Sequence, residues 1–244
     1  MKIAVVGKGG SGKTTTSAVV ARRLASLGHP TLALDCDTNP NLGMSLGLGE
    51  EVTERLVSVR DAVGGEEEHA TSADDLIERF GVDAPDGVRL AVVSAIENPE
   101  PGCPCCGISP EQLLGQLTRP GRVVVADFEA GLGTILRLQD NPVDVVVVVV
   151  EPTAKSLEVG HRAVEAVQEA ALGRVVVTAN RVRDDDDRDR VRAAFPGLDP
   201  VMVPDDPAIV AAERLGLAPL DAAAGAPGVS ALIQLADRLV PVSG

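Results

Sequence analysis

A glycine-rich loop near the start of the chain has the residues needed to hold the phosphates of a nucleotide. It reads Gly7-Lys8-Gly9-Gly10-Ser11-Gly12-Lys13-Thr14-Thr15 and lies between an apolar run (residues 3–6) and an apolar-periodic stretch (residues 17–27). Glycines let successive N–H groups turn toward phosphate oxygens, and the following helix adds its positive dipole end. Lys13 would reach the β- and γ-phosphates, and the Thr14 hydroxyl would bind Mg²⁺. The loop therefore predicts a nucleoside triphosphatase.

The same residues also match the dinucleotide-binding pattern Gly7-x-Gly9-x-x-Gly12. Asp35 lies near the position where that pattern expects an acidic residue. A dinucleotide fold needs close helix packing after its third glycine, whereas this chain has Lys13 and a metal-binding hydroxyl there. We therefore favour the triphosphatase over an oxidoreductase.

Length and composition indicate one α/β domain spanning residues 1–244. The chain has 45% hydrophobic residues, a net charge of −14, no Trp or Tyr and three Phe. An acidic surface without stacking aromatics disfavours nucleic acid as a partner. We find no signal peptide, membrane span or basic amphipathic tail, so we expect no membrane partner and a cytoplasmic location.

Apolar runs recur along the chain with helical stretches between them, at residues 3–6, 31–34, 88–93, 122–126, 143–150 and 174–178. The run at 143–150 has almost no polar alternation, which is typical of a strand buried on both faces of a parallel sheet. The pattern predicts a doubly wound, mostly parallel α/β fold with its site at the carboxyl ends of the strands.

Acidic residues end two of these runs. Asp35 and Asp37 would project to the same side of an extended segment, where they would hold a Mg²⁺-bound water and orient an attacking water, or would only cap the strand. Asp127 ends another run and would bind magnesium through water. The following Gly131 offers a hinge that a γ-phosphate could order.

Asn180 follows the run at residues 174–178. Its amide offers a donor and an acceptor that match adenine, and Arg183 stands where a guanine-binding site would more naturally have an acid. This favours ATP. Lys8 is not needed by an ordinary phosphate loop; it would reach the nucleotide of a neighbouring subunit, or it is a solvated loop lysine.

Three thiols lie within four residues in Gly102-Cys103-Pro104-Cys105-Cys106-Gly107. Thiolates are soft ligands, and a two-fold dimer would supply Cys103 and Cys105 twice, enough for a four-sulfur site for Zn²⁺ or Ni²⁺. The alternatives are buried apolar cysteines or a redox-sensing dithiol. Cys106 has no assigned role.

The loop from Lys8 to Thr15 resembles the deviant Walker A motif of the MinD/ParA/nitrogenase iron-protein class of P-loop ATPases. The resemblance implies an ATP-sandwich homodimer in which Lys8 crosses the two-fold axis, with Asp35 supporting magnesium and Asp37 activating water. It also implies that Asn180-Arg181 and Pro204-Asp205 lie near the base.

Asp127-Phe128-Glu129-Ala130-Gly131 and Cys103-x-Cys105 are similar to motifs of the CooC-type accessory ATPases within that class. That resemblance implies nickel at the dimer interface and a client metalloenzyme such as carbon monoxide dehydrogenase. Our hypothesis is an ATP-hydrolysing dimeric metallochaperone for Ni²⁺ or Zn²⁺. The alternative is a MinD/ParA-like switch ATPase that regulates a protein partner, with redox-sensing or incidental cysteines.

Overall fold

A computed structural model describes residues 1–56, 72–93, 109–129, 131–141 and 143–240. Their strands form one eight-stranded sheet in the order β3-β4-β2-β5-β1-β6-β7-β8. All neighbouring strands are parallel except β3 and β4, which pair antiparallel. The strand order reverses direction about β1, which lies between β5 and β6, so the loop after β1 opens at the switch point of the sheet.

The strands are β1 (Lys2–Gly7), β2 (Thr31–Cys36), β3 (Val82–Ala84), β4 (Val88–Val92), β5 (Val123–Phe128), β6 (Val145–Val150), β7 (Arg174–Val182) and β8 (Val201–Pro204). The helices are α1 (Lys13–Ser26), α2 (Leu42–Leu46), α3 (Glu50–Glu54), α5 (Ala73–Phe80), α6 (Pro110–Gln116), α7 (Leu132–Arg137), α8 (Ala154–Glu169), α9 (Asp185–Ala194), α10 (Pro207–Arg214), α11 (Pro219–Ala222) and α12 (Pro227–Leu239). Two short 3₁₀ turns are η1 (Pro85–Gly87) and η2 (Leu138–Asp140).

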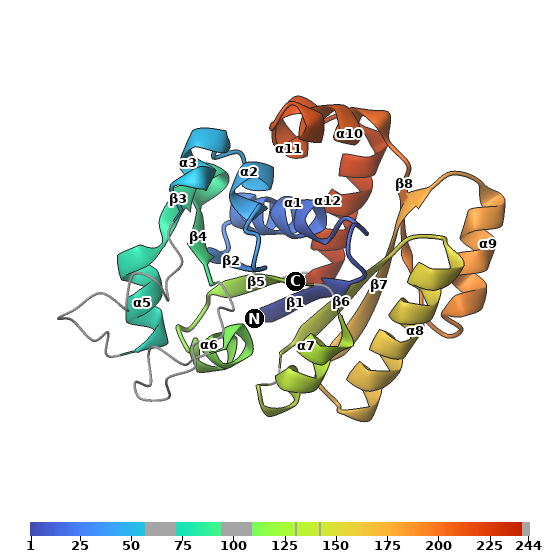
Figure 1. Ribbon diagram of the computed structural model, residues 1–244, viewed down its shortest axis with the longest axis horizontal. Coiled ribbons are helices and arrows are strands. Elements are labelled where there is room, and N and C mark those ends of the chain that lie inside the picture. The colour runs from blue at the N-terminus through green and yellow to red at the C-terminus, as the bar shows by residue number, and fades with distance from the viewer. Residues whose placement is uncertain (57–71, 94–108, 130, 142, 241–244) are drawn as a thin grey trace.

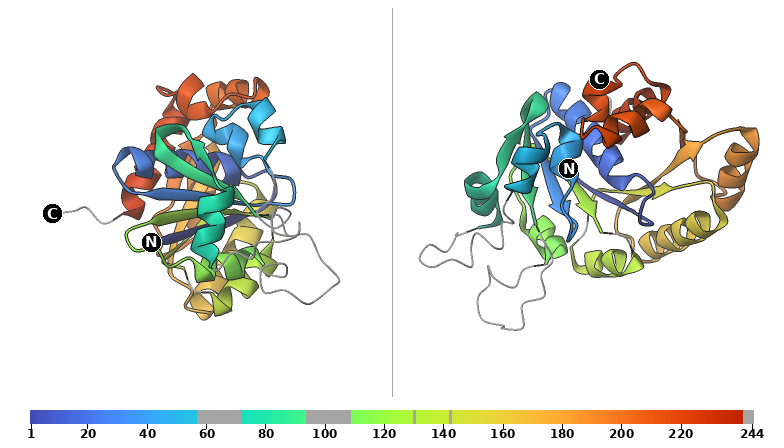
Figure 2. Two further views of the ribbon diagram at one scale, coloured as in Figure 1. Left: turned by 90° about the vertical axis from the view of Figure 1, so that its left-hand side faces the viewer. Right: turned by 45° about the horizontal axis from the view of Figure 1, so that its top comes forward.

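Helices cover both faces of the sheet, as Figure 1 shows and the turned views confirm (Figure 2). Alternate residues of β1 divide between two apolar cores: Ala4 and Val6 pack under α5–α9, and Ile3 and Val5 pack under α1, α2 and α12. Strand β6 is buried along its whole length, so its valines contribute to both cores. The predicted fold class, a doubly wound and mostly parallel sheet, is confirmed.

Each of the six apolar runs overlaps a strand of the sheet, with ends shifted by a few residues. The β1 strand extends to Gly7, β5 runs from Val123 to Phe128, and β7 continues to Val182. Strands β3 and β8 were not predicted. None of the helices in the described part of the chain has the length and apolar character that a membrane crossing requires.

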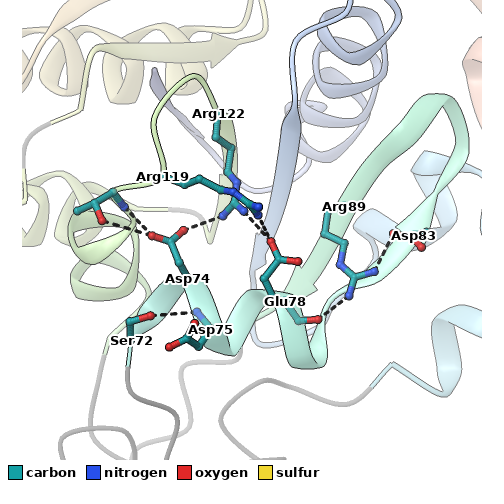
Figure 3. A network of polar contacts seen from close by, with 9 residues as sticks. Ser72, Asp74, Asp75, Glu78, Asp83, Arg89, Arg119 and Arg122 are labelled. Atoms are coloured by element: carbon teal, nitrogen blue, oxygen red, sulfur yellow. Dashed lines mark hydrogen bonds and ion pairs between the residues drawn. The ribbon is translucent and has the colours of Figure 1, made fainter.

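A polar network joins α5 to the segment that leads into β5 (Figure 3). The Arg122 side chain is 8% exposed and contacts Asp74 at 2.8 Å and Glu78 at 3.0 Å, and Arg119 also pairs with Glu78. Asp74 also accepts a hydrogen bond from the Thr118 backbone at 3.0 Å. These contacts hold α5 beside the C-terminal end of α6.

Candidate nucleotide-binding site

The glycine loop lies between β1 and α1, at the centre of the sheet's carboxyl edge. Two of its glycines are required by geometry. Gly7 has φ 153°, and a Cβ there would overlap the carbonyl oxygen of Val149. Gly12 has φ 97°, and a Cβ there would overlap the Asn180 amide. With Gly10 also at φ 78°, the backbone curls tightly before α1 begins at Lys13.

Lys13 is 7% exposed, and its ammonium donates to the carbonyl of Lys8 at 3.4 Å. Burial lowers the pKa of Lys13, while Asp127, Asp37 and Glu129 act in the opposite direction. The Lys13 ammonium is thus hydrogen-bonded to the backbone of the loop and is also attracted by these three acidic side chains. A nucleotide phosphate placed in the loop would give this partly desolvated cation a direct counter-charge.

Three acids predicted from separate strand ends are brought together. Asp35 on β2 and Asp127 on β5 are register partners. Asp127 accepts a hydrogen bond from Ser17 at 3.2 Å and another from the Thr14 hydroxyl. Asp37 lies two residues past Asp35 and accepts the backbone N–H of Asn39 at 2.9 Å. The carboxyl edge of the sheet therefore gathers carboxylate oxygens beside the phosphate loop.

Burial dominates the electrostatics of these acids. It raises the pKa of Asp35 to about 7 and that of Asp127 to about 6, and Coulomb repulsion within the group adds to the rise at Asp35. Hydrogen bonds from Thr14 and Ser17, together with Lys13, oppose the rise at Asp127. Buried carboxylates are costly to ionise without a counter-ion, and Mg²⁺ prefers hard oxygen donors such as these. The donor set therefore fits Mg²⁺, and Thr14, Asp35 and Asp127 are the residues that would hold it.

A pocket opens on the α10 side of the loop. The residues predicted near the base, Asn180, Arg181, Pro204 and Asp205, all line it together with Gly12, Thr15, Thr16, Asp206, Ile209, Val210, Glu213 and Leu232. The Asn180 amide donates to the carbonyl of Ser11 at 2.9 Å, so β7 is tied directly to the phosphate loop. Arg181 has φ 58°, a strained conformation at the irregular end of β7, and its guanidinium pairs with Glu151.

Sequence reasoning missed two neighbours of this site. Ser17 lies one turn into α1 and donates to Asp127. Glu213 on α10 accepts a hydrogen bond from the Thr15 hydroxyl at 2.5 Å, across 198 positions of sequence. Ser17 lies three residues after Thr14, so both side chains are on the same face of α1, and this spacing could have predicted that Ser17 lies near Asp127. No feature of the sequence around Glu213 indicates that it contacts the phosphate loop.

Cys103, Cys105 and Cys106 lie outside the described residues. Within those residues, no group of three or more His, Cys, Asp or Glu side chains is arranged to hold a metal ion. Cys36 is buried at the end of β2, and burial raises the pKa of its thiol well above the ordinary value. This position agrees with a structural role for Cys36.

A run of four aspartates at residues 184–187 forms the start of α9. Asp184 caps α9 by accepting the backbone N–H of Asp187 at 2.9 Å. The Asp187 side chain turns inward and pairs with Arg183 at 3.0 Å. Asp184 therefore caps the helix, and Asp187 forms an ion pair.

A phosphate loop after the central strand β1, acids at the carboxyl ends of β5 and β2 on one side of it, and a pocket beside the loop define a P-loop nucleotide-binding protein. More narrowly, the chain belongs to the CobQ/CobB/MinD/ParA nucleotide-binding domain family, whose sequence profile matches residues 2–220. Membership implies ATP or ADP with Mg²⁺ as the ligands of this site.

Two curated relatives are similar over most of their length. The chain is 31% identical over 232 residues to an uncharacterized ATP-binding protein of Methanocaldococcus jannaschii, covering 88% of this chain and 90% of the relative. It is 30% identical over 241 residues to the carbon monoxide dehydrogenase accessory protein CooC of Rhodospirillum rubrum, covering 91% and 90%. The expected resemblance to the CooC branch is thus confirmed as homology.

Among solved structures, the septum site-determining protein MinD of Pyrococcus horikoshii, complexed with Mg-ADP, superposes with a TM-score of 0.74. The identity is 19%, and the match covers 100% of this chain and 97% of that one. MinD from the MinC:MinD complex of Aquifex aeolicus has a TM-score of 0.70 at 20% identity, covering 100% and 98%. These similarities confirm the fold.

Proposed function

We propose that this protein is an ATP-hydrolysing, dimeric metallochaperone that carries Ni²⁺ or Zn²⁺ for a client metalloenzyme. The observation that carries the proposal is the homology to CooC over about nine-tenths of both chains, combined with a Cys-x-Cys pair in this sequence. CooC is named as an accessory protein of carbon monoxide dehydrogenase. The client we propose is accordingly a nickel enzyme of that kind.

In the proposed reaction, backbone N–H groups from Gly9 to Thr15 bind the phosphates, and Lys13 neutralises charge on the β- and γ-phosphates. Thr14, Asp35 and Asp127 would hold Mg²⁺, which would supply positive charge to stabilise the transferred phosphoryl group. Asp37 accepts a hydrogen bond from the attacking water. The half-buried position of Asp37, two residues beyond Asp35, supports this role because it lies at the open end of β2.

The remaining assignments concern the base and the partner subunit. Asn180, Arg181, Pro204 and Asp205 bind the adenine end of ATP, which their common pocket supports. Lys8 contributes a charge to the nucleotide of the second subunit, so that hydrolysis depends on dimer closure. The position of Lys8 at the first turn of the loop, ahead of Lys13, supports a reach away from its own nucleotide.

The metal is the cargo of the protein in this proposal. Cys103 and Cys105 of each chain supply four thiolates at the two-fold axis, a donor set suited to Zn²⁺ or Ni²⁺. ATP binding closes the dimer around the metal, and hydrolysis reopens it for transfer to the client. Thiolate ligation requires reduced cysteines, so oxidation would abolish binding.

The test is the metal stoichiometry of the reduced wild-type protein and of Cys103→Ser/Cys105→Ser, measured after Ni²⁺ or Zn²⁺ loading and desalting. Cys36→Ser is the control, because Cys36 is buried in the core and plays no part in the proposed site. We expect metal in the wild type and the control, and none in the double variant. Equal metal content in all three proteins would contradict the proposal; ATP-driven dimerisation without metal would favour the switch ATPase.

A further inference from the structure

An acidic side chain, Glu213, lines the pocket beside the phosphate loop. The same pocket is lined by Thr15 at the phosphate end and by Asn180 and Pro204, which we assign to the base. Glu213 comes from α10, which Figure 1 shows above α1. A nucleotide that spans the pocket from its phosphates to its base must therefore pass close to the Glu213 carboxylate.

The carboxylate of Glu213 lies where negative charge is favoured. It accepts a hydrogen bond from the Thr15 hydroxyl at 2.5 Å. Thr15 is the third residue of α1, in the turn whose free N–H groups and dipole attract anions. The phosphates of a bound nucleotide are attracted by the same end of the helix. Glu213 and a phosphate group therefore compete for one positively polarised region.

The pocket is narrow, so that a nucleotide has to displace a side chain. Its open space is about 30 Å³, whereas pockets that hold small ligands usually measure roughly 300–1,000 Å³. Glu213 is exposed to solvent, so its side chain can turn outward without leaving a buried charge unpaired. Arg181, on the other side of the pocket, is held by its ion pair with Glu151. Glu213 is therefore the charged side chain that is easier to displace.

The segment that carries Glu213 is anchored at both ends. At the start of α10, Asp206 accepts the backbone N–H of Gly228 on α12 at 2.8 Å. Beyond α10, Asp221 on α11 forms two hydrogen bonds with the guanidinium of Arg22 on α1, each 2.7 Å long. The Arg22 side chain is only 6% exposed. These anchors favour rotation of the Glu213 side chain over movement of α10, so a displaced carboxylate stays near the pocket.

We propose that Glu213 is an internal competitor of the nucleotide, which holds the Thr15 hydroxyl until a phosphate group displaces it. After displacement the carboxylate remains near the phosphates, because its helix is anchored, and repels them. Glu213 therefore weakens the binding of ADP and speeds its release, which favours exchange for ATP. The inference rests on the proposed function in taking Asn180 and Pro204 as the base end of the site.

The test compares the wild type with Glu213→Gln and Glu213→Ala. Calorimetry measures the affinity for ADP with Mg²⁺, and a filter-binding chase measures the rate at which labelled ADP dissociates. We expect both variants to bind ADP about tenfold more tightly, the lower end of what a hydrogen bond to a charged group contributes. The dissociation rate should fall by a similar factor, since changes in affinity at one site act mostly on dissociation.

Glu165→Gln is the matched control, because its side chain is 56% exposed on α8 and the substitution removes the same charge elsewhere. We expect this variant to bind ADP as the wild type does. Circular dichroism checks that the Glu213 variants fold, as expected for an exposed position. Unchanged ADP affinity in both Glu213 variants would overturn the proposal. Weaker binding would also overturn it, because Glu213 would then be a ligand of the nucleotide.

Two features keep this outcome separate from that of the proposed function. Metal content, dimerisation and hydrolysis do not enter the measurement, so a failed metallochaperone would leave the ADP affinities as they are. Asn180→Ala tests the base assignment, and we expect it to bind ADP more weakly than the wild type. Wild-type affinity in Asn180→Ala would refute that assignment, whereas weak binding in Asn180→Ala with no gain in Glu213→Gln would refute only the competitor.

Discussion

The substitution Asp35→Asn tests the electrostatic account of the acid cluster, with metal and nucleotide removed. Burial raises the pKa of Asp35 from its ordinary value of 3.8 to about 7. The folded state therefore binds this proton more tightly than the unfolded state, and wild-type stability falls as the pH rises from about 4 to about 7. At about 1.4 kcal/mol per pH unit, the cost of ionising Asp35 is about 4 kcal/mol above that range.

The asparagine avoids this cost but loses part of a hydrogen-bond set. Asp35 accepts the backbone N–H groups of Leu42 at 2.9 Å and of Asp37 at 3.2 Å, one on each oxygen. An amide has one acceptor oxygen, so one of these donors would face an NH₂ group at a cost of about 1–3 kcal/mol. Subtracting the cost of the lost hydrogen bond from the cost of ionising Asp35 leaves Asp35→Asn more stable than the wild type by about 1–3 kcal/mol at pH 8. At pH 4 the wild-type carboxyl is neutral, so the variant has no advantage there.

Urea unfolding followed by far-ultraviolet circular dichroism measures this difference, because the chain has no Trp or Tyr for fluorescence. Asp199→Asn is the control: its side chain is 91% exposed, and we expect a change within about 0.5 kcal/mol at either pH. A variant less stable than the wild type at pH 8, or a difference that is the same at pH 4 and pH 8, would refute the reasoning.

Two further substitutions test catalysis and packing. Lys8→Ala should still bind ATP, but its hydrolysis rate should fall by about 10³-fold or more and ATP-driven dimerisation should be lost. Single-turnover assays measure the rate, and sedimentation measures dimerisation. An unaltered hydrolysis rate would rule out a role for Lys8 in the partner subunit's site. Gly160→Ala should lower the free energy of unfolding by about 1–3 kcal/mol, because its Cβ would overlap Val150 and lie 3.1 Å from Phe195. Gly225→Ala, where nothing lies within 4 Å of the new Cβ, is the control for urea unfolding, and equal losses would contradict the packing account.

Local patterns were enough to predict the centre of the fold. The valines of β6 need both faces covered, and the glycine loop needs a strand before it and a helix after it, so each signal demands the same parallel sheet. Strand β8 has only four residues and ends at Pro204, and β3 has three. Segments this short have too little periodicity to be distinguished from loops, and their pairing depends on the neighbours β7 and β4.

The residues of the site also divide into those that local sequence patterns predict and those that only the packed structure brings together. The acids of β2 and β5 were predicted because parallel strands end at one edge of the sheet. The Glu213–Thr15 and Glu111–Arg137 contacts were not, since each joins elements whose relative position only the packed structure determines. Exposed glutamates and arginines are ordinary on helix surfaces, so the sequence carries no mark of which Glu is buried.

Sedimentation of the reduced wild-type protein, with metal analysis of the same samples, tests the central claim most directly. The samples are nucleotide-free, ADP-bound and bound to a non-hydrolysable ATP analogue with Mg²⁺. We expect the analogue to produce dimers that hold about one Ni²⁺ or Zn²⁺ per two chains, as a site shared across a two-fold axis requires. Dimers without metal, or metal bound equally well by monomers, would contradict an intersubunit metal site.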